Sequence, residues 1–269
     1  MTTVTQPEMK ERPSLYPVTT GGWLGGLGNL LRKELDQWWG TKMWWIQLII
    51  WVLILNGVTT IIMLSEGPPS EAVLQEVIQT FLEIAAFAVS FGVIATVQGA
   101  IVGEKELGTA AWVMSKPASR PAFILSKMAA YVLGFAVTAI LVPAIIFIVE
   151  TRLLLGLPYS LQSFLAGLAV ASLSPLFYLA LTLMLGTLFA NRGPIIGICI
   201  ALIMSGLLLN GMFPPQLTMI TPWLLAQVAS GIALETPLPG YWPVPIAAAC
   251  FWIVLFTAVA LWRFSREEF

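Results

Sequence analysis

The sequence predicts an all-α membrane protein with six transmembrane helices, and three observations support this. First, 58% of the 269 residues are hydrophobic and only 10% are charged, whereas a soluble domain has about 25% charged residues. Second, the mean hydropathy is +0.87. Third, the sequence holds six apolar runs that approach the length needed to cross a bilayer, which is about 20 residues of helix. Within hydrocarbon such runs are expected to be helical, because a helix satisfies its own backbone hydrogen bonds.

Residues 1–21 are polar and contain Pro7, Pro13 and Pro17, so they predict a flexible cytoplasmic tail. Residues 22–269 predict one transmembrane domain, which begins with a helix at 22–40. Apolar side chains recur in that helix at helical spacing, at Leu24, Leu27, Leu31, Leu35 and Trp38. Tryptophan and basic residues beside such a stripe are typical of a helix lying in the membrane interface. The alternative is a cytoplasmic extension of the first span.

The six spans are expected at residues 43–64, 84–103, 128–149, 164–190, 194–213 and 243–262. If the N-terminus is cytoplasmic, all of the 13 basic residues except Arg152 fall on the cytoplasmic side. Basic residues are enriched in cytoplasmic loops. The sequence therefore predicts a multi-pass protein of the plasma (inner) membrane with both termini in the cytoplasm.

The segment 214–242 is expected outside the membrane and to contain a short amphipathic or re-entrant helix. Thr221-Pro222 marks the start of that helix, because proline suits the first helical turn. The alternative is a passive surface loop. Within the spans, Pro143 and Pro175 are expected to kink their helices.

A few polar residues interrupt the apolar spans, namely Gln98, Ser172, Ser174 and Asn210. An unpaired polar group is costly in hydrocarbon, so these side chains are expected to face protein or a water-filled path. Gln98 and Asn210 are the candidates for such a path, and hydrogen bonds between helices are the alternative. No expected span holds a central charge, which disfavours a proton or cation relay, although an ion-coupled carrier or channel stays open as an alternative.

Several classes of function are excluded by the residue inventory. The sequence has no histidine, and both cysteines, Cys199 and Cys250, lie within apolar runs. An intramembrane enzyme needs a catalytic set or a metal, and we expect neither catalytic nor metal-binding residues. The phosphate loop G-x-x-x-x-G-K-[ST] is absent from the sequence, so no ATP site is expected. No nucleic-acid partner is expected.

The sequence concentrates charge between the second and third spans, where residues 103–127 carry six charged side chains. Gly108-Thr109 is expected to break and restart a helix, with Thr109 as the N-cap. Lys116 and Arg120 each precede a proline and are expected to be non-helical. The pattern predicts a short helix with an apolar face at Trp112 and Met114, suited to a groove of another protein. The alternative is a solvated loop that only fixes topology.

This stretch, GEKELGTAAWVMSKPASRPAFILSK, resembles the signature of ABC transporter permeases of the type-2 exporter class. The residues that carry the resemblance are Glu104, Glu106, Gly108, Thr109, Ser115, Pro117, Ser119, Arg120 and Lys127. The segment Leu185–Ile195 also resembles the second cytoplasmic turn of that family. The layout of residues 22–269 resembles the family's interfacial elbow helix and six spans.

The resemblance implies a permease subunit that is not itself an ATPase. Two copies of this permease, or one copy and a related permease, would pair with two cytoplasmic ATP-binding subunits. These subunits bind ATP and Mg and dock on the coupling segment 104–121. Docking is then expected at Glu104, Glu106, Gly108, Thr109, Trp112, Met114, Lys116, Pro117, Ser119 and Arg120. The expected substrate is amphipathic or apolar, such as a drug, peptide, lipid or glycan. A complex of this type that remodels a partner without moving solute is a further alternative.

Four charged residues of this segment have a second interpretation that does not involve the ATP-binding subunit. Glu104 and Glu106 are equally compatible with pairing to Arg192 and to the basic residues of the interfacial helix. Arg120 is compatible with binding a lipid phosphate. Lys127 is compatible with reaching along the apolar surface toward water.

Overall fold

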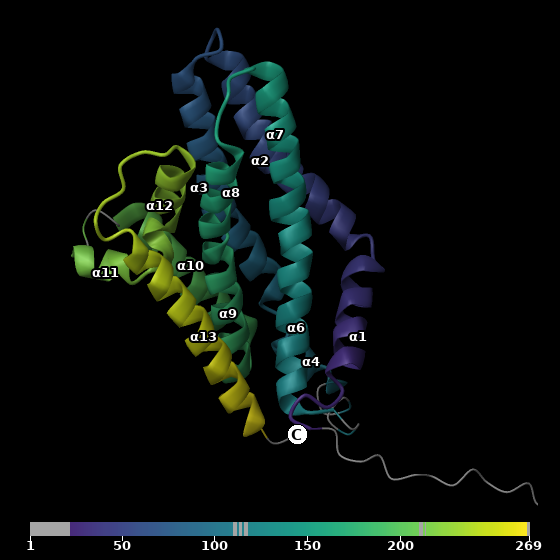
Figure 1. The fold of residues 1–269 in the computed structure, drawn as a ribbon. Coiled ribbons are helices and arrows are strands. Elements are labelled where there is room, and N and C mark those ends of the chain that lie inside the picture. The colour runs from purple at the N-terminus through teal and green to yellow at the C-terminus, as the bar shows by residue number, and fades with distance from the viewer. Residues whose placement is uncertain are drawn as a thin grey trace, which may run out of the picture.

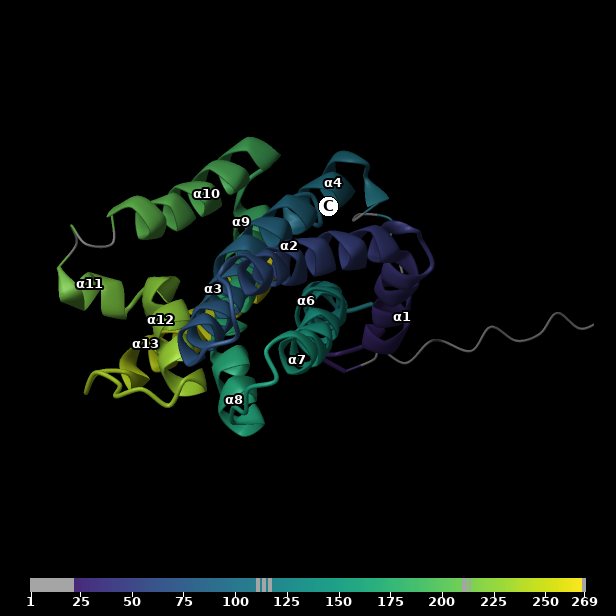
Figure 2. The ribbon, with the colours of Figure 1, turned by 90° about the horizontal axis from the view of Figure 1, so that it is seen from above.

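The computed structural model describes residues 22–109, 112, 115, 118–209, 212 and 214–267, and the predicted tail lies outside the described residues. Within them the chain is helical and contains no strand, as predicted. The helices form a bundle with α3 near its middle (Figures 1 and 2). α1 packs at one edge against α2 and α6, whereas α10 and α11 lie at the opposite edge (Figure 2).

The helices follow one another as α1 (Leu27–Trp39), α2 (Met43–Ser65), α3 (Glu71–Val97), α4 (Val102–Glu106), α6 (Arg120–Phe135), η1 (Ala136–Leu141), α7 (Val142–Leu154), α8 (Leu161–Ala171), α9 (Leu173–Leu188), α10 (Arg192–Leu209), α11 (Pro215–Met219), η3 (Pro222–Leu224), α12 (Leu225–Ala233) and α13 (Pro243–Ser265). Five stretches of the described chain are long and apolar enough to cross a membrane. The sixth predicted span, 194–213, coincides with the shorter apolar helix α10 and stays a prediction, as does the membrane-interface position of α1.

The helix of the second predicted span begins before that span. The span was expected at residues 84–103, but α3 begins at Glu71. The physical reason is a cap: the Ser70 hydroxyl accepts a hydrogen bond from the backbone N–H of Val73 at 3.3 Å. With 27 residues, α3 is about 40 Å long at ~1.5 Å per residue, which exceeds the ~30 Å thickness of the hydrocarbon core of a bilayer.

The core is built around α3, which packs against α2, α8, α9 and α12. Phe81 of α3 lies in a ring cluster with Phe147 and Phe164, at centroid separations of 4.4 and 5.9 Å. The hydroxyl groups of Ser90 and Ser174 are 3.3 Å apart and join α3 to α9. Ser174 therefore makes the helix-to-helix hydrogen bond that was the alternative to facing a water-filled path.

Both predicted kinks coincide with irregular backbone. A π-helical segment, η1, directly precedes Pro143, and the α8–α9 junction at Ser172 lies three residues before Pro175. Proline has no N–H and its ring clashes with the preceding turn, so the helix cannot continue regularly there. The buried Asn56 of α2 donates hydrogen bonds to the Pro143 carbonyl at 3.0 Å and to Glu150 Oε2 at 3.2 Å. Sequence analysis did not single out Asn56, although this polar residue lies within the first predicted span.

The predicted helix after Thr221-Pro222 is present as η3 and α12. It is an integral part of the bundle, because one face of α12 is buried against α8 and α3. At its end, the Ser163 hydroxyl donates a hydrogen bond to Glu235 Oε1 at 2.6 Å. Hydrogen bonds from Ser163 and Ser160 lower the pKa of the Glu235 carboxyl group, because they favour its charged form.

The close packing of α8 on α12 predicts a different cost for the same substitution at two helical glycines. A Cβ atom at Gly167 would lie 2.5 Å from the backbone oxygen of Ala229, whereas a Cβ at Gly197 meets nothing within 4 Å. We expect Gly167→Ala to lower the free energy of unfolding by about 1–3 kcal/mol, as overpacking does. Gly197→Ala is the control and should be neutral or stabilising. Denaturant unfolding in detergent measures both; equal stability of the two variants would contradict the packing.

Candidate functional site

Most of the charged side chains in the described part of the chain gather at one end of the bundle, which we call the basal end. It is formed by α4, the first turns of α6, the end of α13 and neighbouring α1 (Figure 1). The shortest of these elements, α4, carries Glu104, Lys105 and Glu106 in succession. Each of these three side chains pairs with a different part of the bundle.

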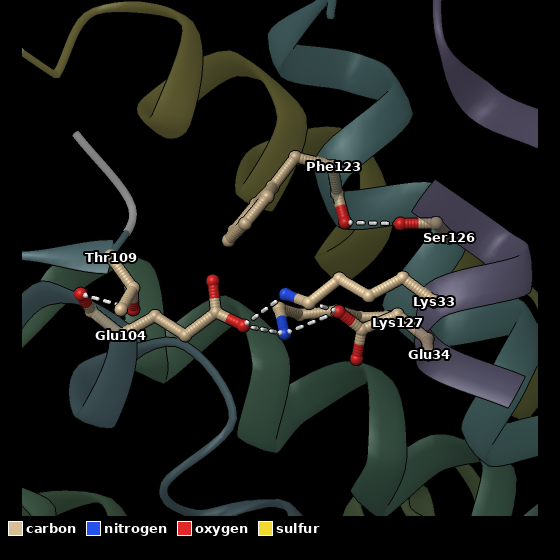
Figure 3. Close-up of polar contacts among 7 residues, drawn as sticks. All are labelled: Lys33, Glu34, Glu104, Thr109, Phe123, Ser126 and Lys127. Atoms are coloured by element: carbon tan, nitrogen blue, oxygen red, sulfur yellow. Dashed lines mark hydrogen bonds and ion pairs between the residues drawn. The ribbon is translucent and has the colours of Figure 1, made fainter. Parts of the chain in front are cut away.

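Glu104 belongs to a buried cluster of four charges (Figure 3). Lys127 Nζ of α6 lies 2.7 Å from Glu104 Oε1 and 3.0 Å from Glu34 Oε1 of α1. Lys33 Nζ completes the cluster, at 3.2 Å from Glu104 Oε1 and 3.4 Å from Glu34 Oε1. The cluster thus joins three segments that are far apart in the sequence: α1, α4 and α6.

The burial of this cluster distinguishes it from a surface ion pair. The side chains of Lys127 and Glu34 are only 3% and 6% exposed, whereas Lys33 is 45% exposed and keeps one side of the cluster in contact with solvent. Two lysines face two glutamates, so the cluster is neutral overall. A buried charge is tolerated only when it is paired, so these four side chains require one another's presence. Lys127 therefore does not reach toward water, so the interpretation of the sequence in which it does is wrong.

Two stacked phenylalanine rings lie beside the cluster, on the side of α13. Lys127 Nζ lies 5.0 Å from the centroid of the Phe123 ring, within the range of a cation–π contact. The Phe123 ring in turn stacks on Phe264 of α13, with the centroids 4.9 Å apart and the planes nearly parallel. Both phenylalanines are buried. Thus α13 also packs against the side chains that hold the buried lysine.

The other two charges of α4 reach the remaining helices. Lys105 Nζ lies 2.9 Å from Glu267, which follows α13, and donates to the Thr187 carbonyl of α9 at 3.3 Å. Glu106 pairs with Arg192, at the start of α10, at 3.4 Å. The guanidinium group of Arg192 crosses close to the chain at Gly103, where an added Cβ would lie 3.1 Å from it. Glycine at position 103 therefore permits this approach.

The turn after α4 presents apolar side chains to solvent. Gly108 has a φ of +67°, a conformation that glycine adopts without strain and that commonly ends a helix. Thr109 and Trp112 have helical backbone, and the backbone N–H of Trp112 donates to the Gly108 carbonyl at 3.2 Å. Leu107 is 79% exposed and Trp112 is 62% exposed. We call residues 107–115 the basal turn; among them 110, 111, 113 and 114 lie outside the described residues.

The predicted capping role of Thr109 is wrong. Gly108 occupies the position ahead of the new turn, because its carbonyl accepts the first helical hydrogen bond. The Thr109 hydroxyl instead donates backward to the Glu104 carbonyl at 3.2 Å. Thr109 thus fixes the basal turn to α4, directly beside the charged cluster (Figure 3).

Ser119 fastens the start of α6 to the chain that precedes α1. Its hydroxyl donates to the Trp23 carbonyl at 2.7 Å and accepts from the Ala122 N–H at 3.2 Å, and its N–H donates to the Gly25 carbonyl at 2.8 Å. Because Ser119 caps α6, the helix begins at Arg120, which corrects the expectation that Arg120 is non-helical. Arg120 donates to the Ser265 carbonyl at the end of α13.

The remaining predicted site residues either lie outside the described residues or lie away from the charged cluster. Met114, Lys116, Pro117 and Asn210 lie outside the described residues. Gln98 lies at the end of α3 and donates to the Ala95 carbonyl at 3.4 Å, so it is at the basal side and not midway along a span. Its assignment to a path through the membrane stays a prediction. Within the described residues, no group of His, Cys, Asp and Glu is arranged to hold a metal ion.

Sequence reasoning missed Glu34 and Glu267 as members of the site. A signal for Glu34 was present, because positions 27, 31, 34 and 38 lie on the same helical face and the other three are apolar. A carboxylate within an apolar stripe requires a buried cation, and Lys127 is that cation. No comparable signal marks Glu267, which lies at the end of a helix where charge is ordinary.

Comparison with families of known proteins identifies a match. Residues 28–269 match a family model described as ABC-2 family transporter protein. No curated protein is significantly similar to this chain. The matched region begins within α1 and includes the whole basal end, from Glu34 to Glu267.

The buried cluster predicts that Lys127 is far more important for stability than an exposed cation nearby. Lys127→Met leaves the carboxylates of Glu34 and Glu104 with only the half-exposed Lys33, so two negative charges face one positive charge. We expect a loss of about 3–5 kcal/mol in the free energy of unfolding. Arg32→Met is the matched control, because Arg32 pairs with Asp36 at 3.9 Å while its side chain is 85% exposed. That pair should contribute about 0–1 kcal/mol. Unfolding curves in detergent measure both variants.

The double variant Lys127→Met/Glu34→Leu provides a stricter test of the same cluster. It removes one charge of each sign and leaves the pair of Lys33 and Glu104, which are 3.2 Å apart. We expect it to be more stable than Lys127→Met alone, with a coupling energy of about 0.5–3 kcal/mol between the two sites. Additive effects of the two substitutions would show that the cluster does not act as a unit.

Proposed function

Because the chain belongs to the ABC-2 transporter family, we propose that it is the permease of an ATP-driven exporter and is moved by a separate ATP-binding subunit docked on the basal turn. The observation that carries this proposal is a contrast between two neighbouring segments. The basal turn exposes Leu107 and Trp112, whereas the adjoining α4 is held by ion pairs to the rest of the bundle.

An exposed apolar turn suits a partner's groove. Large apolar and aromatic side chains are the residues that most often dominate binding energy at protein interfaces. Leu107 and Trp112 lie beyond the ends of the candidate spans, on the segment between α4 and α6. An ATP-binding subunit that covers them would contact this chain outside the hydrocarbon layer. In this proposal ATP and Mg²⁺ bind to the partner, and this chain contributes the docking segment.

The ion pairs supply a way for movement of the partner to reach the spans. A displacement of the basal turn is passed to α4 through the covalent chain and through the Thr109–Glu104 hydrogen bond. From α4 it reaches α1 and α6 through the buried cluster, and α10 through Glu106 and Arg192. A partner shifts the conformation only if it binds one arrangement better than the other. We propose that nucleotide-dependent closure of two ATP-binding subunits provides this difference.

We propose that the basal end lies in the cytoplasm, and its basic residues support this orientation. Lys33, Lys105, Lys127, Arg192 and Arg263 all lie on helix segments at this end, and basic residues are enriched on the cytoplasmic side of membrane proteins. A cytoplasmic basal end is required for docking an ATP-binding subunit. The proposed assembly holds two copies of this chain and two ATP-binding subunits in the plasma membrane, and the proposed substrate is amphipathic or apolar.

Docking on the basal turn predicts that an acidic side chain there releases the partner. We expect Leu107→Asp/Trp112→Asp to weaken binding of the ATP-binding subunit that copurifies with the wild-type chain at least about 30-fold, the loss expected when a hot spot of ~2 kcal/mol is removed. Binding is measured by titrating the purified subunit onto the reconstituted chain. The ATPase stimulation that the wild-type chain produces should be lost in parallel.

Leu153→Asp is the matched control for this experiment. Leu153 is 79% exposed, the same fraction as Leu107, but it lies near the end of α7 at the opposite end of the bundle (Figure 1). This variant should bind the subunit normally. Normal binding by the Leu107→Asp/Trp112→Asp variant, or equal loss in both variants, would refute docking on the basal turn.

A further inference from the structure

A cavity of about 290 Å³ lies between the spans, away from the basal turn. It is bounded by α3, by the end of α6 with η1, and by α8 and α9. Its lining includes Val89, Val93, Ala136, Leu141, Ala169 and Ser172. All the helices that bound it belong to stretches long and apolar enough to cross a membrane. The cavity therefore opens within the span region of the bundle.

The cavity coincides with both irregular segments of the backbone. The π-helical segment η1 contributes Ala136, Ile140 and Leu141, and the α8–α9 junction contributes Ser172 and Pro175. Helix interruptions widen the spacing between neighbouring helices, and π-helical segments are frequent at functional sites. Two separate proline-linked interruptions that face one cavity show that this space is built into the fold.

The chemistry of the lining excludes water as the occupant. Among the lining side chains only Ser172 carries a polar atom, and its hydroxyl already donates to the Leu168 carbonyl at 2.7 Å. A buried water needs two to four polar partners, and an apolar cavity of about 150 Å³ stays dry yet accepts benzene. This cavity has roughly twice that volume, enough for a length of hydrocarbon chain.

An apolar ligand can reach the cavity from the side of the bundle. Leu141 and Leu165 line it and are about half exposed on the outer surface of the bundle. In a membrane that surface faces lipid, so a hydrocarbon chain can enter from the side. An empty apolar cavity is unfavourable because its lining loses packing contacts, which favours an occupied state.

We propose that this cavity is a binding site for one acyl chain of a membrane phospholipid, held between α3, η1 and the α8–α9 junction. The site is independent of the basal turn. Because α3 and α6 adjoin the two ends of the segment 102–119, an acyl chain between them and α8–α9 also limits how closely these spans approach.

The test uses the full-length chain in vesicles of phosphatidylcholine that carries a photoactivatable diazirine in one acyl chain. After illumination, mass spectrometry locates the labelled residues. Val89, Val93 and Leu179 line the cavity but are buried, so a lipid that only coats the outer surface does not reach them. We expect label on these residues. Label confined to exposed residues would overturn the proposal, whether the mouth is closed by a second copy of the chain or simply remains empty.

Filling the cavity provides the second arm of the test. Ala136→Leu places a larger side chain inside it, whereas Ala247→Leu on the exposed surface of α13 is the matched control. We expect label on Val89 and Val93 to be lost in Ala136→Leu and retained in Ala247→Leu, with surface labelling unchanged in both. Ala169→Leu narrows the cavity from another helix and should act in the same direction if Ala136→Leu does not insert stably. Undiminished label on Val89 and Val93 in the filled variants would show that the chain enters elsewhere.

Discussion

The structure depends on one electrostatic constraint: a lysine within a candidate span must be neutralised by side chains from other helices. Lys127 is almost fully buried and meets Glu34 of α1 and Glu104 of α4 at hydrogen-bond distance. Because an unpaired buried charge costs several kcal/mol, α1, α4 and α6 are held in one arrangement. The position of α1 against α6 follows from this requirement together with the contacts of Trp38 on Tyr131 and Phe135.

This constraint gives α4 an importance that its five residues do not suggest. Three successive charged side chains connect it to α1 and α6, to the end of α13, and to α10. The adjoining basal turn is exposed and apolar by comparison. A segment that is open to a partner on one side and fixed to many helices on the other is suited to pass on movement. The apolar cavity also lies against α6, between this helix and α3, α8 and α9.

Much of the fold could be predicted from hydropathy, because a long apolar run in a membrane satisfies its backbone hydrogen bonds by forming a helix. The ends of helices were harder, since Ser70 extends α3 past three glutamates and Ser119 begins α6 at Arg120. At the site, one of two interpretations paired Glu104 and Glu106 with Arg192 and the basic residues of the predicted interfacial helix, and the structure contains the pairs Lys33–Glu104 and Arg192–Glu106. It did not indicate that Lys127 is buried or that Glu34 is its partner. Such pairings depend on three-dimensional packing of distant segments, which spacing along one helix does not encode.

In the proposed mechanism, α1 and α6 move as one body when the partner binds nucleotide. Double electron–electron resonance tests this directly, because it measures the distance between two spin labels. The labels are attached at Arg32 of α1 and Leu133 of α6, which are both exposed. The labelled chains lack Cys199 and Cys250 and are diluted with unlabelled chain. We predict that this distance keeps a single narrow distribution when ATP is added to the complex, while the distance from Leu133 to Leu208 of α10 changes. A shift or broadening of the Arg32–Leu133 distance upon addition of ATP would contradict the account.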